Sequence, residues 1–163
     1  MSPLLDQLSR YAAYHRDRRN VLTHFVGIPM IVLGVATLLA RPTLELGGWL
    51  ISPALVVAIV ATLYYLRLDL RFGLVMGLLL LVCVAVANRF AQGDELIRFG
   101  WGVGLFVVGW AFQFVGHVFE GRKPAFVDDL MGLVIGPLFV VAEVGFALGL
   151  RRDLKAEILA RLR

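Results

Sequence analysis

The stretch GWAFQFVGHVFEGRKPAFVD, residues Gly109–Asp128, begins with the end of a long apolar run. A histidine, a carboxylate and a basic turn that ends at a proline follow. His117 and Glu120 are three residues apart within it, and Gln113 lies four residues before His117. On an α-helix these spacings place all three side chains on one face. The stretch therefore predicts an apolar helix that ends in a polar site for a metal ion or a polar substrate.

The composition around this stretch is that of a membrane protein. Of the 163 residues, 60% are hydrophobic, whereas soluble domains have about 45–50%. The net charge is +4, but the basic residues lie in short clusters between apolar runs and at both ends, as expected for orientation signals and contacts with lipid headgroups. No basic stripe with interleaved aromatic residues is present, which excludes a nucleic-acid partner. A single cysteine, Cys83, excludes disulfides within the chain and thiolate metal centres.

The hydrophobic pattern predicts an all-α integral membrane bundle that forms a single domain over residues 1–163. Residues 1–22 have the apolar spacing of an amphipathic surface helix, residues 23–150 form the bundle, and residues 151–163 are a basic tail. A transmembrane helix needs about 20 apolar residues. Four runs come close to this length or exceed it, namely residues 23–40, 49–66, 72–87 and 99–119.

A fifth apolar run, residues 130–150, is interrupted by Gly136-Pro137 and carries Glu143 near its middle. Because the tail and the N-terminus are both basic, the positive-inside rule places them on the same membrane face, which requires an even number of crossings. We therefore expect four transmembrane helices plus a broken or re-entrant fifth segment, whose irregular backbone must be buried in protein. An intramembrane carboxylate such as Glu143 is either functional or paired.

The same topology brings all three histidines of the chain to one depth, at the cytoplasmic face of a bacterial inner membrane. His15 and His24 are nine residues apart, which on one unbroken helix is about 13.5 Å and half a turn. A bend near residues 18–20 would let them converge, and Asn20 could cap the helix that follows. Imidazoles with at most one carboxylate suit iron, zinc, manganese or copper better than magnesium or calcium.

Each of these residues also has a structural explanation. His15 suits a membrane interface, His24 suits a helix start, and His117 could be a buried partner of Gln113. Glu120 is either a fourth ligand or a solvated acid at headgroup level. Two further residues at the mouth of the site would either bind the carboxylate of a substrate or anchor the helix in lipid headgroups, and these are Arg122 and Lys123.

Two motifs in this chain occur together in one known family. The first is H-x4-N-x3-H within YHRDRRNVLTHFVGIP, residues 14–29, and the second is Q-x2-GH-x2-E-x-R-x-PA, which begins at Gln113. With Asp128, Pro137 and Glu143, they resemble a family of small membrane proteins long described as a domain of unknown function. Its yeast member is the dioxygenase of phytosphingosine breakdown, which performs α-oxidation of 2-hydroxy fatty acids.

The resemblance implies an Fe(II)-dependent membrane dioxygenase that converts a long-chain 2-hydroxy fatty acid and O2 into the acid one carbon shorter. It implies that the matching histidines, His15, His24 and His117, hold the iron and are catalytic. The matching polar positions would be ligands or support the ligands, and these are Asn20, Gln113, Glu120 and Glu143. The expected partners are the fatty acid, O2 and membrane lipids, with a homo-oligomer left open. The alternative is a non-catalytic scaffold or lipid-binding protein, and a transporter is less favoured because few charges lie within the spans.

Overall fold

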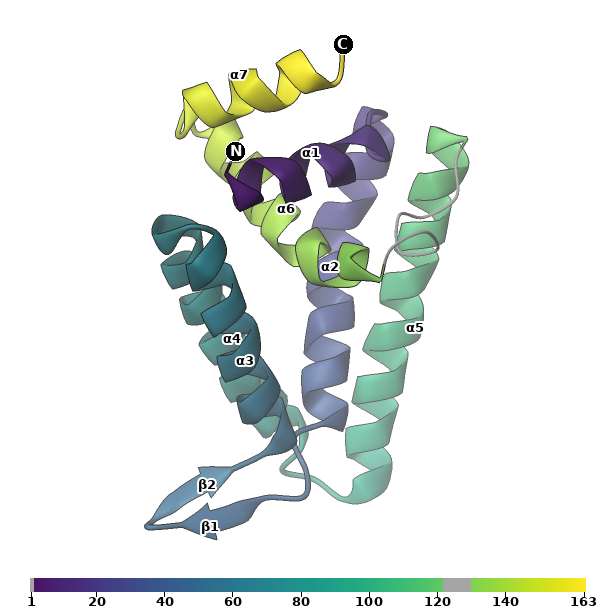
Figure 1. Ribbon diagram of the computed structural model, residues 1–163. Coiled ribbons are helices and arrows are strands. Elements are labelled where there is room, and N and C mark those ends of the chain that lie inside the picture. Colours follow the sequence, from purple (N-terminus) through teal and green to yellow (C-terminus); the bar gives the residue numbers. More distant parts are fainter. Residues whose placement is uncertain (1, 122–129) are drawn as a thin grey trace. The chain divides into compact units, whose positions relative to one another are not determined.

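The computed structural model describes residues 2–121 and 130–163, which form helices and one short hairpin (Figure 1). The predicted all-α class is confirmed. The elements are α1 (Pro3–Ala13), α2 (Arg18–Leu38), β1 (Leu44–Leu46), β2 (Trp49–Ile51), α3 (Pro53–Leu68), α4 (Leu70–Phe90), α5 (Glu95–Glu120), α6 (Met131–Ala147) and α7 (Arg152–Arg161).

The chain divides into two compact units, and each is described by itself. The terminal unit comprises Met1–Ile28 and Phe112–Arg163, and the central unit comprises Pro29–Ala111. Helices α2 and α5 contribute one part to each unit. The prediction that residues 1–163 form a single domain stays a prediction.

Three helices in the described part of the chain, α2, α4 and α5, are long and apolar enough to cross a membrane. Helices α6 and α7 pass the same criterion as a pair but are bent by 117°, so the number of candidate spans is three or four. The predicted second span is shorter than expected. Helix α3 has 16 residues, or about 24 Å at helical rise, against about 30 Å for the hydrocarbon core.

Helix α3 is short because the first residues of that predicted span, Trp49–Ile51, form strand β2 and not a helix. They pair with β1 through the glycine turn Gly47-Gly48, where both residues have positive φ (57° and 83°), as a two-residue hairpin turn requires. The helix begins only after Ser52, whose Oγ accepts a hydrogen bond from the Leu55 N–H at 3.2 Å.

The fifth apolar segment breaks at a different place from the one predicted. Helix α6 continues through Gly136 and Pro137, and the sharp bend follows at Gly149 and Arg151, which both have positive φ (77° and 51°). Gly136 instead permits a close approach, because a Cβ there would lie 3.0 Å from the Tyr11 hydroxyl of α1. The Gly-Pro pair therefore marks a helix contact and not an interruption.

Small side chains form the core of the central unit, where they let helices approach closely. The cluster consists of Ala36, Ala54, Ala58, Val84 and Ala87. Many large apolar side chains on α3 and α4 are exposed, as a lipid-facing surface requires. They include Val60, Leu63, Leu74, Leu78 and Leu81.

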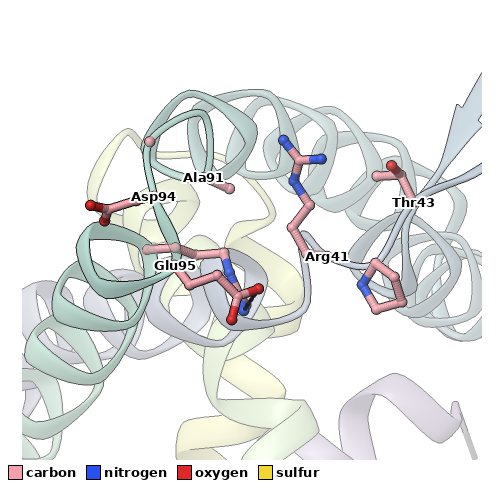
Figure 2. Close-up of a pocket in the computed structure, with 8 residues that line it drawn as sticks. Arg41, Thr43, Ala91, Asp94 and Glu95 are labelled. Carbon is pink, nitrogen blue, oxygen red and sulfur yellow. Dashed lines mark hydrogen bonds and ion pairs between the residues drawn. The ribbon is translucent and has the colours of Figure 1, made fainter.

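The central unit also contains a pocket of about 790 Å³ between helix ends (Figure 2). It is lined by Arg41, Pro42, Thr43, Ala91, Gly93, Asp94, Glu95 and Arg98. Arg98 is buried and donates to the Leu38 carbonyl at 2.8 Å and to Glu95 at 3.4 Å. Arg98 therefore pairs with a carbonyl at the C-terminus of α2 that has no partner within the helix. We assign this pocket a structural role.

Candidate metal centre

The path of the chain between α1 and α2 is what allows two histidines to meet. Helix α1 ends at Ala13 and α2 begins at Arg18, so the break lies over residues 14–17, slightly before the predicted bend. Asp17 caps α2, because its Oδ1 accepts from the Arg19 N–H at 2.8 Å. The predicted cap, Asn20, lies inside the helix and is fully buried, so that prediction was wrong.

The structure brings all three histidines together within the terminal unit. His15 lies in the break, His24 in the second turn of α2 and His117 in the last turn of α5. One ring nitrogen from each lies within 4.8 Å of the others, and the His15 and His24 Nε2 atoms are 3.0 Å apart. The side chains are 5%, 1% and 7% exposed, respectively. Three buried imidazoles thus surround one point, as a metal site requires.

Backbone carbonyls determine which ring nitrogens carry protons. His15 Nδ1 lies 2.7 Å from the Tyr11 carbonyl, and His24 Nδ1 lies 2.8 Å from the Asn20 carbonyl. A carbonyl only accepts, so each Nδ1–H donates and each Nε2 of a neutral ring presents a lone pair. At 3.0 Å these two lone pairs repel each other unless a cation lies between or beside them.

A proton is a poor candidate for that cation. Burial lowers the pKa of His15 to about 4, which outweighs the opposite effect of its hydrogen bond to the Tyr11 carbonyl. The His15 imidazole is therefore neutral at pH 7, and a neutral imidazole is the form that binds a metal. The donor set fits a metal ion.

Helix α5 also places two buried polar atoms near the histidines for which the described residues offer no hydrogen-bond partner. Within the described residues, neither His117 Nδ1 nor Gln113 Nε2 has a hydrogen-bond partner. Leaving such a group buried and unpaired costs about 1–3 kcal/mol. The two residues are one helical turn apart, so the unpaired atoms indicate that this face of α5 is complete only with a ligand.

Two aromatic side chains, those of Tyr11 and Phe139, lie against the His15 ring. The Tyr11 ring stacks on the His15 ring, with centroids 4.1 Å apart and an angle of 6°. Phe139 of α6 contacts both rings, with centroids 4.9 Å from Tyr11 and 5.7 Å from His15. Neither aromatic residue was predicted as part of the site, although Tyr11 lies one helical turn before His15, a spacing that indicates contact.

Glu120 contacts the loop that carries His15. Its Oε1 accepts from the Arg16 N–H at 2.9 Å, and its Oε2 accepts from the Asp17 N–H at 2.9 Å and from Asn20 Nδ2 at 3.0 Å. Among the described residues, the group that could hold a metal consists of the three histidines. The assignment of Glu120 as a fourth ligand stays a prediction, and both of its oxygens already have protein donors.

The other predicted site residues lie in different surroundings. Asn20 connects two members of the site, because its carbonyl accepts from His24 and its side chain donates to Glu120. Glu143 is half-buried on α6, and its role near the site stays a prediction. Arg122 and Lys123 lie outside the described residues.

Comparison with known proteins identifies the family of the chain. A family model described as "2-hydroxy-palmitic acid dioxygenase Mpo1-like" matches residues 1–148. The chain belongs to the Mpo1-like family. It is 37% identical over 158 residues to the 2-hydroxy-palmitic acid dioxygenase MPO1 of Saccharomyces cerevisiae, an alignment that covers 95% of this chain and 87% of the yeast protein. No solved structure matches the chain. The family resemblance of the two motifs is thereby confirmed.

Proposed function

We propose that this chain is an Fe(II)-dependent dioxygenase that shortens long-chain 2-hydroxy fatty acids by one carbon. The observation that carries the proposal is the buried cluster of three imidazoles, in which the Nε2 lone pairs of His15 and His24 face each other at 3.0 Å. Membership of the Mpo1-like family and the name of the yeast relative support the dioxygenase activity and the substrate class.

His15, His24 and His117 would hold the metal ion. Three neutral imidazoles leave coordination positions for further ligands, and nitrogen ligands suit Fe(II). When bound, Fe(II) supplies the redox chemistry that O2 requires in order to react with the hydroxy acid. The carbonyls of Tyr11 and Asn20 keep the imidazoles in the tautomer that presents Nε2.

The reaction balances without an external reductant. The hydroxy acid R–CH(OH)–COOH and O2 give R–COOH, CO2 and H2O, so the C1–C2 bond breaks and C1 leaves as CO2. The hydroxyl carbon gives up three electrons and the carboxyl carbon one, and these four electrons reduce O2. The polar end of the substrate must therefore reach the histidines, while its acyl chain needs apolar surroundings.

A site at the membrane surface suits a substrate that has a polar end and an apolar acyl chain. The site lies where the last turn of apolar helix α5 meets the first turns of α2, so an acyl chain could extend along lipid-facing helix surfaces while its head reaches the metal. We propose that Arg122 and Lys123 guide the carboxylate. The basic N-terminal region supports a location at the cytoplasmic face of a bacterial inner membrane.

Metal analysis combined with oxygen uptake tests the proposal. Protein purified without oxygen should contain stoichiometric iron and should consume O2 with 2-hydroxypalmitate but not with palmitate, which lacks the hydroxyl group. The product should be the fifteen-carbon acid. His117→Ala should lose both iron and turnover while the protein still folds. Absence of stoichiometric metal from the wild-type protein would instead support a scaffold or lipid-binding protein.

A further inference from the structure

We infer that Glu120 is the positioning residue of the histidine centre, and that its carboxylate sets the spacing of the three imidazoles without binding the metal. The inference rests on the proposed metal site and deepens it. It concerns contacts between segments that are about one hundred residues apart in the sequence.

The contacts of the Glu120 carboxylate lead to two of the histidines, and its own place on α5 links it to the third. The N–H groups of Arg16 and Asp17, which directly follow His15, donate to its two oxygens. The Asn20 amide donates to Oε2, while the Asn20 carbonyl accepts from His24 Nδ1. Glu120 itself lies three residues after His117, in the last turn of α5. One side chain thus connects the loop of His15, the first turns of α2 and the end of α5.

A carboxylate suits this position for two physical reasons. It is an acceptor with two oxygens and room for about four donors, and here it receives three. An anion is disfavoured at the C-terminus of its own helix, but the N-terminus of α2, against which Glu120 lies, favours negative charge. Hydrogen bonds to a charged acceptor are about twice as strong as neutral ones. The charge of Glu120 is therefore stabilised by α2 and not by α5.

These contacts also distinguish positioning from ligation. Both Glu120 oxygens face donors on the α2 side, and the group of potential ligand atoms within the described residues contains histidine nitrogens alone. Asp17, the carboxylate two residues after His15, is engaged by Arg19 through both of its oxygens. Without the Glu120 carboxylate, the same three histidines should still be the ligands, but their positions should be less well fixed.

Cobalt titration of the full-length metal-free protein tests this distinction, because Co(II) reports its ligands through visible absorption. Glu120→Gln should weaken Co(II) binding about 10- to 100-fold, as for other residues that orient metal ligands, while the absorption bands at saturation stay the same. Glu157→Gln, an exposed acid on α7, is the matched control and should bind Co(II) like the wild type. Changed bands at saturation would identify Glu120 as a ligand, and unchanged affinity would show that it does not position the centre. Either result overturns the inference.

Amide hydrogen exchange tests the same role without any metal. In the metal-free protein the Arg16 and Asp17 amides should be protected, and Glu120→Gln should speed their exchange at least several-fold, whereas Glu157→Gln should not. Equal exchange in Glu120→Gln and wild type would overturn the inference. Because this measurement needs neither iron nor turnover, it separates a failure of the positioning role from a failure of the proposed dioxygenase function.

Discussion

The two units of the molecule differ in the polar groups that they bury, although both have apolar residues in their interiors. The terminal unit buries polar side chains, namely His15, Asn20, His24, Gln113 and His117. The central unit is built round small apolar ones, namely Ala36, Ala54, Ala58, Val84 and Ala87. A buried polar group destabilises a fold unless it is paired, whereas apolar contacts need no partner. The terminal unit should therefore depend on a ligand for its stability, and the central unit should not.

Replacing a buried polar residue in each unit should show the largest difference. His24 and Thr37 both lie on α2 and are almost wholly buried, but Thr37 donates only to the Leu33 carbonyl within the same helix. His24→Ala removes a proposed ligand, so metal affinity and turnover should fall by more than the roughly 10- to 100-fold typical of supporting residues. Thr37→Val should keep both. Equal iron content in the two purified variants would remove the contrast between the units.

Removing the metal should loosen one unit selectively. A ligand present at about 100 times its dissociation constant stabilises a protein by about 2.7 kcal/mol, and the proposed ligands all belong to the terminal unit. Treatment with a chelator should therefore speed amide exchange in α1 and in the first turns of α2, with little change in α3 and α4. Uniform acceleration across all four helices would mean that the units do not differ in this way.

Two glycines, one in each unit, allow a matched comparison in which the expected effects are smaller. A Cβ on Gly34 would lie 2.8 Å from the Gly102 carbonyl and the Phe106 nitrogen in the central unit, whereas a Cβ on Gly116 would overlap Thr23 and Asn20 in the terminal unit. Such overpacking costs about 1–3 kcal/mol.

Thermal unfolding in detergent should accordingly show both Gly34→Ala and Gly116→Ala to be destabilised. Only Gly116→Ala should also lose metal affinity, because it displaces Asn20 from Glu120 and His24. Gly100→Ala is the control, since a Cβ there has nothing within 4 Å and should stabilise the helix by up to about 1 kcal/mol. Metal loss in Gly34→Ala would show that the central unit also shapes the site.

The smallest expected effect concerns the ion pair between Asp6 of α1 and Arg161 of α7. The hydrogen bond from Arg161 lowers the pKa of Asp6 below its usual 3.8. A depressed carboxyl pKa contributes stability that is present above the unfolded pKa, about 3.9, and is lost as the pH falls through the folded value. Exchange at α7 amides, relative to the intrinsic rate at each pH, should thus rise below about pH 4 in the wild type but stay level in Asp6→Asn. A parallel rise in the variant would assign the effect to other groups.

Much of this fold could be predicted from local patterns in the sequence. Helical spacing placed Gln113, His117 and Glu120 on one face, and hydropathy located the three long candidate spans. Short signals were less informative, because a proline inside an apolar run is compatible both with a break and with a helix that continues, as α6 does through Pro137. The hairpin before α3 was missed because its eight residues, 44–51, are too few for a clear periodicity.

The clustering of the three histidines could be predicted from the sequence, but the contacts of Glu120 could not. The three histidines follow from the motifs and from the predicted topology, which places them at one membrane face. The part played by Glu120 depends on donors at Arg16, Asp17 and Asn20, about one hundred residues away, and main-chain donors have no side-chain signature. Sequence spacing alone therefore could not separate a ligand from a residue that positions ligands.

The division of the terminal unit between two distant parts of the chain has a consequence for biosynthesis. The ribosome releases His15 and His24 long before His117, and the entire central unit emerges in the interval. A nascent chain can thus offer an incoming metal ion no more than a pair of imidazoles. If the three histidines hold a metal ion as proposed, the centre is complete only after His117 has been synthesised, and a chain that ends before His117 should bind the metal more weakly than the whole chain.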